Sequence, residues 1–250
     1  MTQSILIIGQ SNMAGRGFRD EVEPIKNDKL YVLRNGRWRA MYIPVNPDRV
    51  TAGINLVESF ADLYAKEHDV DVGIIPCADG GSSLDQWQVG GLLFDHACYM
   101  AELASRTSTI AAVLWHQGES DTAAHQYPVY EEKLTVILEA FRKKLNLYDV
   151  PFLVGGLGDY LEFNTRSDNF KNYVHVNAAL KRIAEKLPMT GFVSAEGLGA
   201  NPDNLHFSAQ ALREFGVRYY DAFTKLEDKN KVFCEKSTLD EAIRTGIEHL

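Results

Sequence analysis

The stretch "ILIIGQSNMAGRG", residues 5–17, indicates both a fold class and a reactive group. Four apolar residues lead into Gly9, and Ser11 follows two positions later, between Gln10 and Asn12. A continuous apolar run is typical of a strand that is covered on both faces. A strand that merely turns needs Gly, Asn or Pro and no hydroxyl. A serine presented at the end of a buried strand therefore suggests a nucleophile.

The rest of the chain repeats this apolar pattern between amphipathic segments. Short apolar runs occur at 72–75, 110–115, 152–154 and 192–195, and apolar faces with helical spacing occur at 56–64, 130–145, 176–187 and 212–223. Strands that alternate with helices imply right-handed crossovers and a parallel sheet. The sequence thus predicts one α/β domain over residues 1–230. Its expected form is a three-layer α/β/α sandwich with a five-stranded parallel sheet, as in flavodoxin-like folds.

Two segments depart from the alternation. Residues 30–42 are predicted to form a β-hairpin insertion that turns on Asn35-Gly36, the pair favoured in type I′ turns. Residues 231–250 are predicted to form a separate C-terminal helical tail, in which Thr238 and Glu241 have the spacing of a capping box.

Composition narrows the classes of partner. The 250 residues are 45% hydrophobic and 24% charged, with a net charge of −8. An acidic chain of ordinary globular composition argues against nucleic acid or an anionic membrane as the main partner. Its three cysteines lack metal-binding spacing, no apolar run approaches ~18 residues, and no signal peptide is visible. These features predict a cytoplasmic protein.

Three polar segments follow predicted strands, at 76–87, 116–121 and 201–208. Ligands of open α/β sheets bind at the carboxyl ends of the strands. All three segments are therefore expected to lie at the same edge as Ser11.

Asp203 and His206 lie three residues apart in the last of these segments. An Asp can hold an imidazole by one nitrogen while the other nitrogen accepts the proton of a serine. Ser208 is predicted to cap the helix that follows. By itself this spacing is also compatible with a turn-capping Asp beside a surface histidine.

Gly80, Gly81 and Gln117 are candidates for an oxyanion hole, together with the N–H of Ser11. Glycine lets backbone N–H groups approach a ligand closely, and the side-chain amide of Gln117 offers a further donor. A tight turn after a strand is the alternative explanation of the glycine pair.

The remaining polar and aromatic candidates are more ambiguous. Glu119 could serve His206 as a second carboxylate, pair with Arg16 or cap a helix, and an orienting role is favoured. Arg16 is expected in an ion pair, with a substrate clamp as the alternative. Trp38 and Trp87 could stack on a sugar ring. The spacing of His116, Glu119 and His125 fits no zinc pattern, so no metal is predicted.

Four blocks carry a family resemblance: "GQSNMAGRG" (9–17), "DGGSSLDQW" (79–87), "WHQGESD" (115–121) and "DNLHFS" (203–208). In this order they resemble the sialate O-acetylesterase and acetylxylan esterase group of the SGNH hydrolases, over residues 5–224. The pattern differs from the G-x-S-x-G elbow of α/β-hydrolases, because position 13 is Met.

The resemblance implies a serine esterase that removes acetyl groups from a small carbohydrate without metal or organic cofactor. It implies Ser11 as nucleophile, His206 as base and Asp203 as its partner, although some members use a Glu at the position of Glu119. The implied oxyanion donors are Ser11, Gly80 or Gly81, and Gln117. Together with the residue arguments, it makes the following residues candidates for substrate binding: Gln10, Asn12, Arg16, Trp38 and Trp87.

Other functions stay open at this point. An SGNH lysophospholipase or thioesterase would need an apolar channel, whereas the segments near Ser11 are polar. A catalytically inactive carbohydrate-binding protein would be favoured by loss of Ser11, His206 or the glycine pair, all of which are present. A flavin or phosphate binder would want an anion-binding loop that residues 9–15 resemble only loosely. A homo-oligomer is compatible with the sequence.

Overall fold

The computed structural model describes residues 2–227. Within them, one mixed sheet runs through the middle of the molecule in the order β3-β2-β4-β1-β5-β6-β7. The strands are β1 (Thr2–Gly9), β2 (Leu30–Arg34), β3 (Arg37–Ala40), β4 (Val72–Pro76), β5 (Ser108–His116), β6 (Phe152–Gly155) and β7 (Thr190–Val193). The predicted tail at 231–250 lies outside the described residues.

The five predicted strands are present as β1, β4, β5, β6 and β7, but the prediction of a five-stranded sheet is wrong. The hairpin turns on Asn35 and Gly36, both at positive φ as a type I′ turn requires. Its first strand, β2, then pairs in parallel with β4, and β3 pairs antiparallel with β2. Because Leu30 and Val32 bury their side chains there, the hairpin extends the sheet to seven strands.

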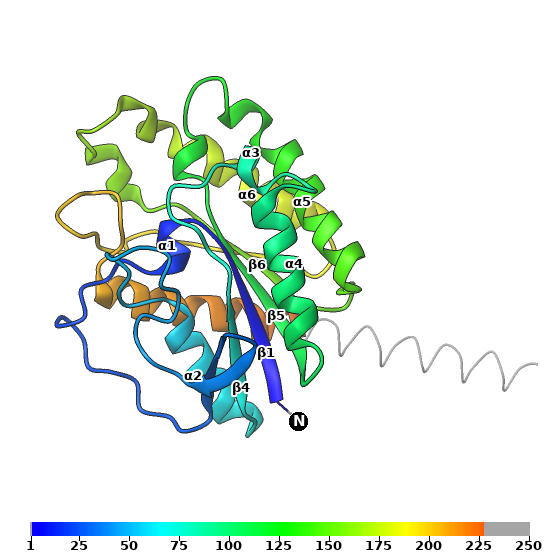
Figure 1. The fold of residues 1–250 in the computed structure, drawn as a ribbon. Helices are drawn as coiled ribbons and strands as arrows, with labels where there is room; N and C mark the ends of the chain where they lie inside the picture. The colour runs from blue at the N-terminus through cyan, green and yellow to red at the C-terminus, as the bar shows by residue number, and fades with distance from the viewer. Residues whose placement is uncertain (1, 228–250) are drawn as a thin grey trace, which may run out of the picture.

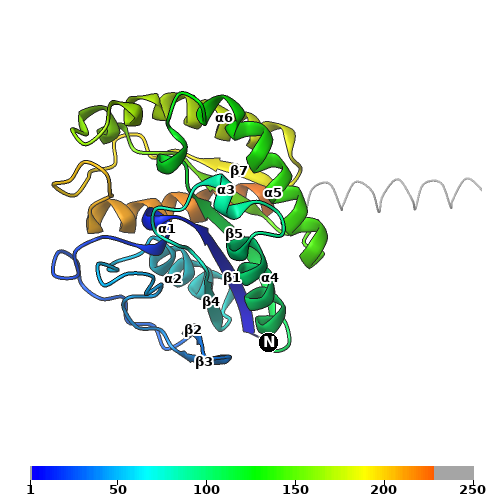
Figure 2. The same ribbon diagram turned by 45° about the horizontal axis from the view of Figure 1, so that its top comes forward.

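Helices cover both faces of the sheet. Those described are α1 (Ser11–Ala14), α2 (Val57–His68), α3 (Leu84–Trp87), α4 (Leu92–Ala104), α5 (Tyr130–Leu145), α6 (Tyr173–Lys186) and a last helix over residues 209–227. Helices α4, α5 and α6 pack side by side on one face, while α2 and the last helix share the other (Figures 1 and 2). The predicted three-layer arrangement is confirmed. None of the helices in this part of the chain is both long and apolar enough to cross a membrane.

The central strand β1 explains where a site can form. Residues Ile5 to Ile8 are fully buried, since helices lie on both sides of the strand. Strand β4 pairs on one side of β1 and β5 on the other, so the strand order changes direction at β1. Such a switch point opens a crevice at the carboxyl ends of the strands. Ser11 begins α1 directly beyond that end of β1.

Candidate active site

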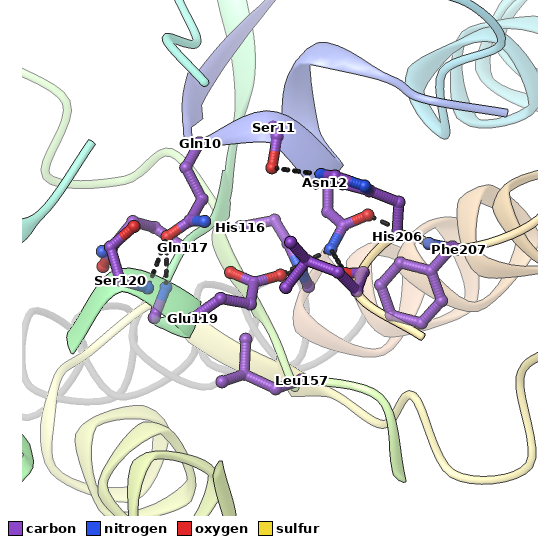
Figure 3. A network of polar contacts seen from close by, with 12 residues as sticks. Gln10, Ser11, Asn12, His116, Gln117, Glu119, Ser120, Leu157, His206 and Phe207 are labelled. Carbon is purple, nitrogen blue, oxygen red and sulfur yellow. Dashed lines mark hydrogen bonds and ion pairs between the residues drawn. The ribbon is translucent and has the colours of Figure 1, made fainter. Parts of the chain in front are cut away.

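Ser11, His206 and Asp203 form a continuous hydrogen-bonded chain at this edge of the sheet. The Nε2 atom of His206 lies 3.0 Å from Ser11 Oγ, and its Nδ1 atom lies 2.7 Å from Asp203 Oδ2. Figure 3 shows the Ser11 hydroxyl directed at the imidazole. In this geometry Nδ1–H donates to the carboxylate, so Nε2 is left to accept the serine proton. The structure brings together the three residues predicted for this role.

The loop that carries Asp203 and His206 is shaped by its own hydrogen bonds. Asp203 Oδ1 accepts from the backbone N–H groups of Leu205 (3.0 Å) and His206 (3.1 Å), which leaves Oδ2 to contact Nδ1 of the imidazole. Ser208 Oγ accepts from Ala211 N–H at 3.2 Å, so the predicted helix cap is confirmed. The loop therefore presents the imidazole from a fixed backbone.

The electrostatics favour an ionised Asp203. Partial burial works against the charged carboxylate, but hydrogen bonds from the His206 ring and from the N–H groups of Leu205 and His206 outweigh it. The pKa of Asp203 is consequently held below its usual value. An ionised carboxylate stabilises the imidazolium that forms when His206 takes a proton.

Asn12 connects this loop to α1, the helix that begins with Ser11. Its Nδ2 donates to Leu205 O at 3.1 Å and to Glu119 Oε1 at 2.5 Å, and its Oδ1 accepts from Phe207 N–H at 3.1 Å. The residue is fully buried. Asn12 was predicted as a substrate contact, and this prediction is wrong because both ends of its amide are committed inside the protein.

Glu119 belongs to a second, buried histidine–carboxylate pair. Its Oε1 lies 3.3 Å from Nε2 of His116, and both side chains are almost completely inaccessible. Burial disfavours its charge, yet contacts with His116 and Asn12 hold the pKa of Glu119 below its usual value. The carboxylate beside His206 is that of Asp203, and Glu119 reaches the triad only through Asn12. This geometry agrees with the orienting role favoured from sequence.

Gln117 does not face the cleft, which corrects its assignment as an oxyanion donor. Its Nε2 donates to Ser82 O at 3.1 Å and to the Asp121 carboxylate, and its Oε1 accepts from Tyr130 Oη. The side chain is fully buried. Both amide hydrogens therefore already have acceptors within the protein. Through these bonds the Gln117 amide connects the end of β5 to α5 and to the loop before α3.

The backbone N–H of Gly80, also predicted as an oxyanion donor, already has an acceptor within the protein. This N–H donates to Asp48 Oδ2 at 2.8 Å, and the same carboxylate takes two hydrogen bonds from Arg16 at 2.7 and 3.0 Å. A Cβ at Gly80 would meet the Arg16 guanidinium at 2.5 Å, which explains the glycine. Arg16 is thus the ion-pair residue that was expected, with Asp48 rather than Glu119 as its partner. Within residues 2–227 the N–H of Gly81 has no acceptor, and Gly81 lines the cleft.

The two tryptophans proposed as sugar platforms are elsewhere, so both predictions are wrong. Trp38 lies across Gly73, near the start of β4 and so at the opposite end of the sheet from Ser11. Trp87 is fully buried, where it donates to Ser82 Oγ and packs edge-on against Trp115. The short helix α3 turns Trp87 inward, which its position in a polar motif did not reveal.

A cleft of about 470 Å³ lies above the triad. It is lined by Gln10, Ser11, Arg16, Arg49, Gly80, Gly81, Glu119, Ser120, Thr122, Ala123, Gln126, Ser167, Asn169, Phe170, Leu205 and His206. Sequence reasoning missed Phe170 and its polar neighbours Ser167 and Asn169. The available signal was the polar stretch after β6, the same signal that pointed to the other loops. Among the described residues no cluster of His, Cys, Asp and Glu could hold a metal ion.

Comparison with known proteins gives a consistent group of relatives. The family model described as "Carbohydrate esterase, sialic acid-specific acetylesterase" matches residues 2–225. An Arabidopsis thaliana protein described as a "probable carbohydrate esterase" is 28% identical over 247 residues, covering 88% of this chain and 90% of its own.

Solved structures share the fold. The crystal structure of that Arabidopsis protein matches 89% of this chain and 98% of its own with a TM-score of 0.80 and 25% identity. NanS matches 91% of this chain and 98% of its own at 0.72 and 17%. A carbohydrate acetylesterase from Xanthomonas citri matches 88% of this chain and 55% of its own at 0.65 and 19%.

Proposed function

Since the chain belongs to the sialic acid-specific acetylesterase family of carbohydrate esterases, and is therefore a carboxylic ester hydrolase acting on acetylated carbohydrates, we propose that it works through an acetyl-enzyme on Ser11. The observation that carries this proposal is the chain of contacts from Ser11 Oγ through His206 to Asp203, at 3.0 and 2.7 Å. A nucleophile, a base and a group that orients the base are then all in reach.

In the acylation step, Ser11 Oγ attacks the acetyl carbonyl carbon while His206 Nε2 takes its proton. The tetrahedral intermediate collapses when the imidazolium returns that proton to the sugar oxygen, and the C–O bond to the sugar breaks. Asp203 stabilises the imidazolium throughout. In the second step His206 activates a water in the same way, which releases acetate and restores Ser11.

The negative oxygen of the tetrahedral intermediate needs donors that are not used elsewhere. Within residues 2–227 the backbone N–H groups of Ser11 and Gly81 have no acceptor, and both residues line the cleft. We assign them to the oxyanion, where a well-aimed donor contributes about 3 kcal/mol.

The charges of the cleft favour a neutral sugar over an acidic one. Arg16 is paired with Asp48, and Arg49 contacts Asp79 at 3.1 Å. The remaining carboxylate, Glu119, has one buried oxygen without a hydrogen-bond partner among the described residues. A substrate carboxylate would thus meet no unpaired cation here, and leaving it unpaired would cost free energy.

The uncharged lining suits sugar hydroxyls. Gln126 and Asn169 present side-chain amides that make no hydrogen bond within the described chain, and Phe170 adds an aromatic face. A pyranose can place its C–H groups on such a ring while its hydroxyls meet the amides. This combination also argues against the long-acyl alternative, because each extra methylene needs apolar surface to gain ~0.8 kcal/mol.

Acetate release measured on a matched set of esters tests the proposal. An acetylated methyl glycoside should be cleaved with a higher kcat/KM than p-nitrophenyl acetate, and p-nitrophenyl acetate at least about tenfold better than the octanoate. Equal rates from acetyl to octanoyl, without gain from a sugar, would favour the lipase-like alternative. Comparing 9-O-acetyl-N-acetylneuraminate with its methyl ester isolates charge, and the neutral ester should be the better substrate.

A further inference from the structure

We propose that Gln10, not Gln117, supplies the side-chain donor of the oxyanion hole. In this proposal Gln10 acts in catalysis and Gln117 has a structural role. The inference rests on the proposed acetyl-enzyme mechanism. It goes beyond that mechanism by assigning the amide hydrogens of Gln10 Nε2 to the negatively charged oxygen of the transition state.

The first argument is the orientation of the Gln10 amide. Its Oε1 accepts from the backbone N–H groups of Gly118 and Ser120, each at 3.2 Å. Because these partners are donors only, the oxygen of the amide must face them, and Nε2 must face the other way. Figure 3 shows this nitrogen on the side of Ser11. The amide cannot turn without leaving the N–H groups of Gly118, which is buried, and Ser120, which is partly buried, without their acceptor.

The second argument is that this nitrogen is unused. Gln10 is 3% exposed and lines the cleft beside Ser11, and among residues 2–227 its side chain makes hydrogen bonds only through Oε1, to Gly118 and Ser120, which leaves Nε2 without an acceptor. Its backbone is fixed as well, because its N–H donates to His116 O at 2.9 Å. A preoriented donor with no ground-state partner is what stabilises charge that develops only in the transition state.

The third argument is a census of donors around Ser11. The Gly80 N–H is taken by Asp48, and both hydrogens of Gln117 are taken by Ser82 and Asp121. The N–H groups of Ser11 and Gly81 remain. Gln10 is the neighbouring side chain that completes a set of three.

The test uses substitutions that separate the proposed donor, the NH2 group of Gln10, from the oxygen that accepts from Gly118 and Ser120. Gln10→Glu keeps an acceptor for Gly118 and Ser120 but removes the NH2 group, and Gln10→Met removes both functions at similar volume. Each should lower kcat for p-nitrophenyl acetate about 10²- to 10³-fold with KM changed less than about threefold. Thermal unfolding of Gln10→Glu should stay close to that of the wild type.

A transition-state analogue distinguishes a direct role from a structural one. Methylboronic acid forms a tetrahedral anion on a serine, so its inhibition constant should weaken in proportion to the loss of kcat. Inhibition by acetate, which makes no such adduct, should change little. A general distortion of the site would weaken both.

Gln117→Met is the matched control. It should lower the unfolding temperature while the folded enzyme keeps kcat within about fivefold of wild type. The inference is overturned if Gln10→Glu and Gln10→Met keep kcat within about fivefold, or if Gln117→Met loses more kcat than Gln10→Met. Ser11→Ala separates the two proposals: residual activity there would instead contradict the acetyl-enzyme mechanism itself.

Discussion

The molecule contains two histidine–carboxylate pairs with the same three-residue spacing, at the same edge of one sheet. Asp203 and His206 follow β7 and are 24% and 17% exposed. His116 is the last residue of β5 and Glu119 follows it in the next turn, and these side chains are 0% and 2% exposed. His206 reaches Ser11, while His116 is surrounded by Phe207 and Phe215. Spacing alone does not make a catalytic pair. Access to the cleft and the direction of the second ring nitrogen decide the role.

The buried pair still contributes to the exposed one. Glu119 holds Asn12, and Asn12 holds the backbone on both sides of His206 through Leu205 O and Phe207 N–H. We interpret the His116–Glu119 pair as a structural support for the loop that carries Asp203 and His206. Three substitution or pH experiments test this division.

The largest expected effect is the difference in kcat between substitutions of the two histidines, His206 and His116. His206→Ala should lower kcat at least about 10⁴-fold with folding intact, because the serine then has no base. His116→Ala should mainly lower the unfolding temperature, since it leaves the buried Glu119 carboxylate with one partner fewer. Steady-state kinetics and circular dichroism on both variants measure this. A His116 variant that folds normally yet loses as much kcat would abolish the distinction.

The second largest expected effect is the difference in kcat between substitutions of the two carboxylates, Asp203 and Glu119. Asp203→Asn should cost about 10³- to 10⁴-fold in kcat, because the amide no longer selects the tautomer of His206 that accepts the serine proton. Glu119→Gln keeps an oxygen for Asn12 and should cost less than about 30-fold. If the loss at Glu119 exceeded that at Asp203, with both variants folded, the acid of the triad would have to be reassigned.

The smallest expected effect is the pH dependence of stability. The pKa of Glu119 is lower in the folded protein than its usual value, so the unfolded chain binds the proton more readily. The stabilisation from ionised Glu119 is therefore complete above about pH 4.3, the ordinary glutamate pKa, and is lost as pH falls through the folded value.

Urea unfolding of wild type and Glu119→Gln at several pH values checks this sign. The difference in unfolding free energy should be largest at neutral pH and should narrow below about pH 4. Asp203→Asn should show the same trend with a smaller amplitude, because its carboxylate is partly exposed and better screened. A gap that widens on acidification would mean that Glu119 is neutral in the native state.

Much of the site was predictable because its signals are local. The apolar run before Ser11 predicts a buried strand and the place where it ends, and the polar segments after other strands mark the same edge. The spacing of Asp203 and His206 allows one to hold the other without any distant contact. The orientation of Trp87 is not a local signal, because the four-residue helix α3 directs its side chain into the core and the motif DGGSSLDQW does not show that helix.

The sequence by itself determined the alternation of strands and helices, the position of the proposed nucleophile Ser11 at the end of a buried strand, and the pool of polar groups around it. Burial periodicity and short-range spacing are properties of neighbouring residues. Only the tertiary structure decided that the hairpin joins the sheet, that His206 rather than His116 meets Ser11 from 195 positions away, and that Gln10 rather than Gln117 keeps free amide hydrogens. The physical reason is that a polar side chain points where its partners are, and those partners come from strands and loops that meet only when the sheet has formed.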